Sequence, residues 1–224
     1  EAVQAVLKCY QAFTVACGAL GLTQARDAFL TSLCHYSLPP RPREKLRETS
    51  GAISFAPVDT AYEPLPHTRL SAKNVQALKA VFNIAHCMGG LLGSSWSLIL
   101  DTFEQLDRII ATSKTTAAGG ARAVELATAI GGPEATSNEL SILTAALNNL
   151  FEGSARLDDV AVGHFLTALS TSCFASLAHE ATSKERIATP GSAAATGPRL
   201  FALTKFVDTV LVNLRRIGIL WPLV

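Results

Sequence analysis

The chain has 224 residues and a formal net charge of +1, and 49% of its residues are hydrophobic against 17% charged. This composition is sufficient for one domain with a sizeable core. The scattered lysines and arginines argue against nucleic-acid binding, which requires a basic face. No apolar run approaches the ~20 residues that span a bilayer, and no secretory signal is evident. The cysteines are odd in number and lie in apolar sequence, which predicts reduced, buried thiols in a cytosolic protein: Cys9, Cys17, Cys34, Cys87 and Cys173.

Seven stretches of the chain have apolar residues at every third or fourth position, the spacing of amphipathic helices. No stretch shows the sustained alternation and turn signals of strands. The sequence therefore predicts an all-α protein with about seven helices. We expect three helical hairpins over about 3–35, 73–112 and 137–181, and a lone C-terminal helix over about 199–219.

The links between these helices alternate in length. Within each hairpin the link is short and contains glycine, whereas residues 37–70, 113–135 and 182–198 form long links rich in Pro, Gly, Ala, Ser and Thr. This rhythm places the tight turns at one edge and the long loops at the other. We predict an α-solenoid of stacked hairpins, armadillo- or HEAT-like, in which each hairpin buries its apolar stripe against its neighbours. The chain starts without methionine, so we interpret residues 1–224 as a single helical-repeat segment of a longer protein.

The hairpin over residues 73–110 is the most informative part of the chain. Its turn contains Gly89, Gly90 and Gly93, which we expect to supply backbone conformations with positive φ. The predicted buried stripes are Val75, Leu78, Val81, Phe82, Ala85 and Met88 in the first helix and Leu98, Ile99, Phe103, Leu106, Ile109 and Ile110 in the second; the predicted solvent-facing residues of the second helix are Asp101, Glu104, Gln105 and Arg108.

Polar residues of the same hairpin have structural interpretations. Asn74, near the start of the first helix, is expected to hydrogen-bond locally, with a bridge to a neighbouring hairpin as the alternative. His86 is predicted to hydrogen-bond a free carbonyl near the helix end or a neighbouring turn. Ser94 or Ser95 is predicted to cap the second helix, with Trp96 as a large packing residue beside it.

No residue pattern predicts catalysis, a metal or a cofactor. The pairs His86-Cys87 and Cys34-His35 are adjacent on helices, so their side chains diverge by roughly 100° and cannot easily hold one zinc ion. Residues 93–97 lack the second glycine of a nucleophile elbow. Residues 89–94 lack the lysine of a phosphate-binding loop. Asp158-Asp159 is predicted to stabilise a helix N-terminus, not to act in acid–base chemistry.

Basic residues offer a candidate interaction surface in two places. Arg41 and Arg43 belong to the densest basic cluster, which Glu44 and Glu48 dilute. Arg215 and Arg216 lie near the C-terminus and could contact an acidic partner or lipid headgroups, although two arginines on a helix usually face solvent.

Several motifs together resemble a known family. The central motif runs from Asn74 to Trp96, and an Arg-Asp-Ala-Phe element with Arg26, Asp27 and Phe29 precedes it. Residues 150–160 and 211–221 follow in the same order. These stretches resemble the helical region downstream of the catalytic domain in the large Arf guanine-nucleotide exchange factors, and most closely their relatives without that domain, the monensin-sensitivity (Mon-two) scaffold family. The matching residues of the central motif are Asn74, Ala85, His86, Gly89, Leu92, Gly93, Ser95 and Trp96.

The resemblance implies a non-catalytic scaffold on trans-Golgi and endosomal membranes, peripheral and cytoplasmic, that works in vesicle traffic and endosome-to-Golgi retrieval. It also implies self-association and partnership with Dopey-type proteins, an aminophospholipid flippase and Arf or Arf-like GTPases. An alternative is the regulatory region of a true Arf exchange factor whose catalytic domain lies upstream. Under both interpretations the segment itself is not an enzyme and acts through protein contacts or a membrane surface.

Overall fold

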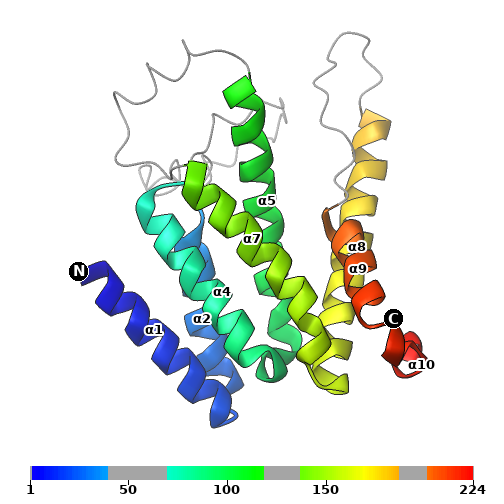
Figure 1. The fold of residues 1–224 in the computed structure, drawn as a ribbon, viewed down its shortest axis with the longest axis horizontal. Helices are drawn as coiled ribbons and strands as arrows, with labels where there is room; N and C mark the ends of the chain where they lie inside the picture. The colour runs from blue at the N-terminus through cyan, green and yellow to red at the C-terminus, as the bar shows by residue number, and fades with distance from the viewer. Residues whose placement is uncertain (1, 40–69, 119–136, 187–200, 224) are drawn as a thin grey trace, which may run out of the picture.

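A computed structural model describes residues 2–39, 70–118, 137–186 and 201–223, which are helical almost throughout (Figure 1). These ranges contain no β-strand, so the predicted all-α class is confirmed. The helices are α1 (Ala2–Ala19), α2 (Thr23–Ser37), α4 (Ala72–Leu92), α5 (Trp96–Ala118), α7 (Ser137–Gly153), α8 (Asp159–Arg186), α9 (Phe201–Val212) and α10 (Ile217–Leu220), with short 3-10 turns η1 (Gly93–Ser95), η2 (Ser154–Arg156), η3 (Leu214–Arg216) and η4 (Trp221–Leu223).

The helices form two layers, and consecutive pairs stack in chain order. In one layer α1 packs on α4, α4 on α7 and α7 on α9; in the other, α2 packs on α5, α5 on α8 and α8 on α10. The short links within pairs lie at the same edge, the lower one in Figure 1. Each pair therefore buries its apolar faces mainly against adjacent pairs, which is the expected helical-repeat arrangement.

The predicted stripes of α4 and α5 form the centre of the core. Val75, Leu78 and Val81 of α4 and Ile99, Phe103 and Leu106 of α5 are almost completely buried. The rings of Phe82 and Phe103 stack with their centroids 4.4 Å apart, so the two helices contact through large apolar side chains. One prediction for α5 is wrong: Glu104 is buried, because α8 covers that face and places Ser172 and Ser176 at 3.4 Å from its carboxylate.

Two helices begin with side-chain caps. At α4, Ser71 Oγ accepts a hydrogen bond from the Asn74 backbone N–H (3.3 Å), and Asn74 Oδ1 accepts one from the Ser71 N–H (3.0 Å). At α8, Asp158 Oδ1 accepts a hydrogen bond from the Ala161 N–H (2.9 Å). These bonds satisfy backbone donors that have no partner within the helix.

The turn between α4 and α5 differs from the prediction. Gly89 and Gly90 lie inside α4, and only Gly93 has a positive φ, of 52°. Gly89 is small for a packing reason: a Cβ there would lie 2.6 Å from Leu157 Cδ2 and 3.4 Å from the Trp96 ring. The glycine thus leaves room for the side chains of Leu157 and Trp96 to pack on α4.

The predicted seventh helix over 199–219 is also wrong in its extent. The structure breaks it at Asn213, whose φ is −101°, into α9, η3 and α10. The Asn213 amide nitrogen donates to Ser154 Oγ (2.9 Å) and to the Thr209 carbonyl (2.8 Å). Because these bonds hold Asn213 against η2, the chain turns and α10 packs on α8.

The expectation about membrane-length runs is corrected in part. Two stretches, Ala72–Ala111 and Asp159–Ala178, are long and apolar enough to cross a membrane by length and composition alone. In the first, 61% of the tested window is buried inside the fold, and in the second 33%. Packing accounts for the apolar character of the first stretch more fully than for that of the second.

The cysteines are free, but not all are buried as predicted. Cys34 and Cys173 are buried, Cys17 is half-buried, and Cys9 and Cys87 are exposed. Burial raises the pKa of the Cys34 thiol to about 11, against the opposing effect of a hydrogen bond with Thr102. Burial and the nearby Glu104 carboxylate raise the pKa of Cys173. The two buried thiols are therefore poor nucleophiles.

Candidate interaction surface

Three of the predicted motif residues form one hydrogen-bonded cluster between α2 and the α4–α5 turn. Asp27 Oδ1 accepts hydrogen bonds from Arg26 Nε (2.7 Å) and from Ser95 Oγ (2.6 Å). Arg26 Nη2 donates to Ser95 Oγ (2.8 Å), and Arg26 Nη1 donates to the Leu91 carbonyl. Ser95 therefore joins the turn to α2 through this cluster, where a capping role for α5 was predicted.

The electrostatics of this cluster favour the charged form of Asp27. Partial burial raises the pKa of Asp27, but the hydrogen bonds from Arg26 and Ser95 and the charge of Arg26 outweigh it, so the net pKa is lowered. The Arg26 guanidinium is buried and has a partner for each of its donating nitrogens. A buried charge with its partners in place fixes the geometry of a contact.

Trp96 and Gly89 form a second, apolar cluster where α4, α5 and α8 meet. Trp96 is 1% exposed, and its indole nitrogen donates to the Gly89 carbonyl (3.2 Å). Its ring meets that of Phe165 edge to face with the ring centroids 4.5 Å apart. The ring of Phe165 in turn lies beside that of Phe151, with the ring centroids 5.6 Å apart. The sequence prediction that Trp96 is a packing residue is confirmed.

The remaining motif residues lie apart from these clusters. Asn74 caps α4 and also bridges to the first hairpin, because its amide nitrogen donates to the Tyr36 carbonyl (3.0 Å). Phe29 stacks on Phe13 of α1 with centroids 5.7 Å apart. His86 is exposed, and among the described residues its side chain shows no hydrogen bond, so the predicted bond to a carbonyl is absent there.

The four arginines of the candidate interaction surface have different positions. Arg41 and Arg43 lie outside the described residues. Arg215 is exposed on η3. Arg216 is mainly structural: it donates to the carbonyls of residues 157 (2.6 Å), 154 and 155 (both 3.2 Å), and it pairs with Asp159 (3.1 Å). Arg216 thus attaches the α9–α10 unit to η2, and it is not a free surface charge.

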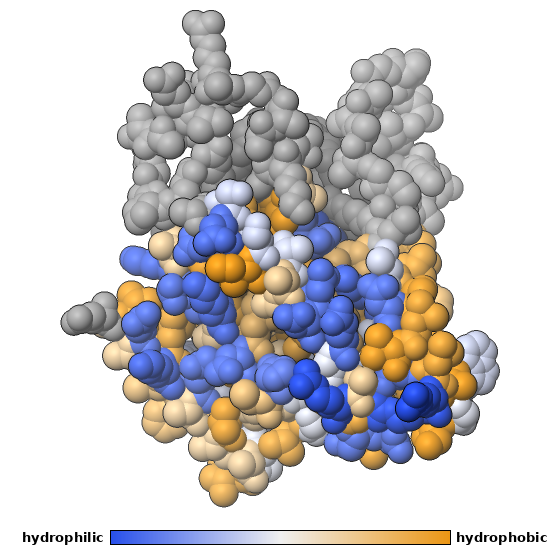
Figure 2. All heavy atoms as spheres, viewed as in Figure 1, coloured by the Kyte–Doolittle hydropathy of each residue, from blue (hydrophilic) through white to orange (hydrophobic). Residues whose placement is uncertain are grey.

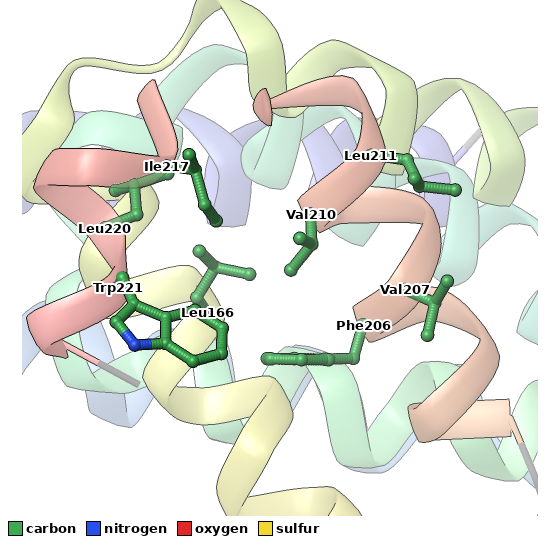
Figure 3. A pocket seen from close by; sticks show the side chains of 8 residues that line it. All are labelled: Leu166, Phe206, Val207, Val210, Leu211, Ile217, Leu220 and Trp221. Atoms are coloured by element: carbon green, nitrogen blue, oxygen red, sulfur yellow. The ribbon is translucent and has the colours of Figure 1, made fainter. Parts of the chain in front are cut away.

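An apolar surface covers α9 and α10. Figure 2 shows hydrophobic residues gathered at the right of the view, over α8, α9 and α10. Within this surface lies a groove of about 130 Å³ between α9 and α10, with α8 as its floor (Figure 3). The residues that line it are all apolar: Leu166, Phe206, Val207, Val210, Leu211, Ile217, Leu220 and Trp221.

Among the described residues, no group of three or more His, Cys, Asp or Glu side chains could hold a metal ion. Of the pairs considered for zinc, Cys34 is buried whereas His35 is exposed. His86 and Cys87 are both exposed, and no third ligand lies near them in the part of the chain that the structure describes. The geometry of the described residues thus offers contact surfaces and internal clusters.

Comparison with known proteins identifies relatives of the chain. No family model matches it. It is 33% identical to the protein named MON2 homolog of Xenopus laevis and 31% identical to that of Homo sapiens, each over 98% of this chain. The MON2 homolog of Drosophila melanogaster is 30% identical over 96% of the chain.

The match covers nearly all of this chain but little of those proteins. The chain spans 14% of the length of the frog and human proteins and 15% of the fly protein. The alignments run over 252 to 259 positions without leaving a large part of the chain unmatched. The chain is therefore homologous to one segment of these long MON2 proteins.

Proposed function

We propose that this chain is a non-catalytic scaffold segment of a Golgi and endosome trafficking protein. The observation that carries the proposal is the match to MON2 proteins over 98% of the chain, combined with a two-layer helical stack. A stack of this kind presents rigid helix faces over a long distance, which suits protein–protein contacts.

The internal clusters support a role that depends on shape. Arg26, Asp27 and Ser95 fix α2 to the α4–α5 turn, and Arg216 fixes α9–α10 to η2. Both clusters lie at junctions between consecutive helix pairs, so they set how each pair is placed on the next. Accurate placement of the pairs is what a scaffold needs in order to hold its partners at fixed positions.

By the family resemblance, we further propose attachment to trans-Golgi and endosomal membranes and self-association. Dopey-type proteins, an aminophospholipid flippase and Arf or Arf-like GTPases are the proposed partners. Among the arginines that sequence analysis proposed as contacts for an acidic partner, Arg215 is the one that the structure describes and shows to be exposed. A charge reversal, Arg215→Glu, in the natural full-length protein should weaken capture of such a partner, whereas Arg156→Glu, at an exposed arginine of η2, serves as the matched control.

A nucleotide-release assay tests the non-catalytic part of the proposal. Purified full-length protein is added to an Arf GTPase loaded with fluorescent GDP, and the release rate is compared with that of the GTPase alone. The scaffold interpretation predicts unchanged release. Strong acceleration would overturn it and favour the alternative, a regulatory segment within an active exchange factor.

A cell assay tests the trafficking part. Cells that lack the protein receive wild type, Trp96→Ala or Phe174→Ala, and retrieval of an endosomal cargo to the Golgi is measured. We expect rescue by wild type and by Phe174→Ala, and poor rescue by Trp96→Ala, because Trp96 lies in the core whereas Phe174 is 70% exposed on α8 outside the groove. Normal retrieval in cells without the protein would contradict the proposed role.

A further inference from the structure

The outer face of α9 has an apolar stripe that nothing in the described structure covers. Its first three residues follow one another at intervals of four, so they lie along one side of α9, and its fourth comes after the helix, at the start of η3. The inner helices of the same layer, α4 and α7, have no such stripe: their exposed large hydrophobic residues are Leu91 and Ile142, one on each. The stripe consists of Leu203, Val207, Leu211 and Leu214, which are between 42% and 57% exposed.

The groove beside this stripe has the size and chemistry of a socket for a side chain. Val207 and Leu211 belong to both the stripe and the groove lining, so the two surfaces are continuous. The volume of about 130 Å³ is close to that of apolar cavities that take up a benzene-sized molecule. Since no lining residue is polar, the group that fits is an aliphatic or aromatic side chain.

The packing order of the stack indicates what covers this surface. Along the chain, α4 covers α1, α7 covers α4 and α9 covers α7, so each helix receives its successor on the side away from its predecessor. The free stripe of α9 lies on the side where this order would place the next helix. The MON2 proteins are about seven times longer than the matched segment, which spans 14% of their length.

We propose that the stripe and groove of α9–α10 dock a further helix pair of the same polypeptide. The docking helix is amphipathic, and one of its large apolar side chains enters the groove between Phe206, Leu166 and Trp221. The proposal extends an interface already present between α7 and α9, and it does not depend on the trafficking role. Its alternatives, a second copy of the protein, another protein or a lipid surface, are separate outcomes of the test.

The first test is site-specific crosslinking in the natural full-length protein. Leu211 is replaced by the photo-crosslinker p-benzoylphenylalanine, and the products are mapped by mass spectrometry. Ile142, which is exposed on α7 outside the groove, receives the same replacement as the control. We expect an intramolecular product from position 211 that joins it to a helix later in the chain, and none of that kind from position 142.

Other crosslinking results would overturn the proposal. A product with a second copy would assign the surface to self-association. A product with another protein, or with lipid in vesicles of phosphatidylcholine and phosphatidylserine, would assign it to that partner. The absence of any product would leave the stripe uncovered in the native protein, which also contradicts the proposal.

Cysteine labelling provides a second measurement with a closely matched control. Val207 and Ile142 are each 47% exposed, so Val207→Cys and Ile142→Cys should react equally with a maleimide if both stay uncovered. If a helix pair covers α9, Val207→Cys should react about tenfold or more slowly, since labelling then requires local opening. Peptide-resolved detection separates both sites from the exposed Cys9 and Cys87. Equal rates in variants with unchanged unfolding midpoints would refute the docking of a helix pair.

Discussion

The helices α4 and α9 occupy equivalent places in the same layer, yet their surroundings differ. Helix α4 lies between α1 and α7 and also contacts α2 and α8, so its stripe is buried over five turns. Helix α9 is packed by α7 and α8 on one side, while its other side remains apolar and exposed. In Figure 1 the two helices are seen at the centre and at the right of the stack.

The two regions are also held by different interactions. Around α4 the contacts are mostly apolar and aromatic, with Trp96, Phe103 and Phe165 fully buried. The α9–α10 unit has a small apolar cluster around Leu220 and depends more on the hydrogen bonds of Asn213 and Arg216 to η2. The centre should therefore determine global stability, whereas the α9–α10 unit should respond locally to substitutions.

The two tryptophans of the chain provide the largest test of this difference. Trp96→Ala should lower the free energy of unfolding by about 3–5 kcal/mol, because it removes a buried indole and leaves a cavity between α4, α5 and α8. Trp221, which is 73% exposed at the edge of the groove, is the matched control, and Trp221→Ala should cost under about 1 kcal/mol. Chemical denaturation followed by circular dichroism measures both. Equal losses would remove the distinction between centre and end.

A second test removes the charge in the cluster between α2 and the turn. Arg26→Met keeps much of the side-chain volume but leaves the Leu91 carbonyl and Ser95 without a donor, and it leaves Asp27 without its cation. We expect a loss of about 2–3 kcal/mol, because buried polar groups without partners are costly. The exposed Lys79 on α4 supplies the control: Lys79→Met should change stability by less than about 0.5 kcal/mol.

A third test addresses the α9–α10 unit. Arg216→Met should cost about 1–2 kcal/mol, since the carbonyls of residues 154, 155 and 157 lose their donor while water can reach part of the site. Hydrogen exchange should become faster at amides of α9 and α10 and stay unchanged in α4 and α5. Arg215→Met, next to it but exposed, should change neither region. Faster exchange throughout the stack would show that the end and the centre unfold together.

The same comparison shows what the sequence could predict. The stripes of α4 and α5 followed from periodicity, because a helix in the middle of a stack has a buried face and a solvent-facing one. The pairing of helices followed from the alternating lengths of the links, and the packing role of Trp96 from the size of its side chain. Glu104 was assigned to the wet face because its own helix gives no sign that α8 covers it. The break at Asn213 was missed because apolar residues continue on both sides of it.

The hydrogen-bonded clusters and the apolar groove were less predictable from the sequence for a related reason. Arg26 and Ser95 are 69 positions apart, and no local pattern indicates that a serine after a glycine turn will bond an arginine of the preceding hairpin. Arg216 looked like a surface charge because its partners are backbone carbonyls, which leave no mark in a sequence. The groove requires side chains from α8, α9 and α10 together, so it appears only when the turn at Asn213 is known.

The smallest expected effect is a pH dependence at Asp27. Its pKa is lower in the folded chain than the ordinary value of 3.8, so on acidification the unfolded chain binds the proton first. The stabilisation is fully present above that ordinary value and is lost as the pH falls through the folded pKa. Because the Asp27 side chain is 41% exposed, solvent screens the interaction and the loss should be smaller than the effects of the three substitutions above.

Two variants resolve this acid dependence. Asp27→Asn should remove the part of the stability loss between pH 5 and pH 2 that comes from Asp27 (roughly the range over which carboxylates titrate), so its curve should be flatter than that of wild type. Ser95→Ala removes one of the two hydrogen bonds that lower the pKa, and its curve should fall between the other two. Denaturation midpoints measured between about pH 5 and pH 2 would give the order of the three pH dependences. If all three curves run parallel, folding does not lower the pKa of Asp27, and the contribution of the Arg26–Asp27–Ser95 cluster to stability does not depend on the charge of Asp27.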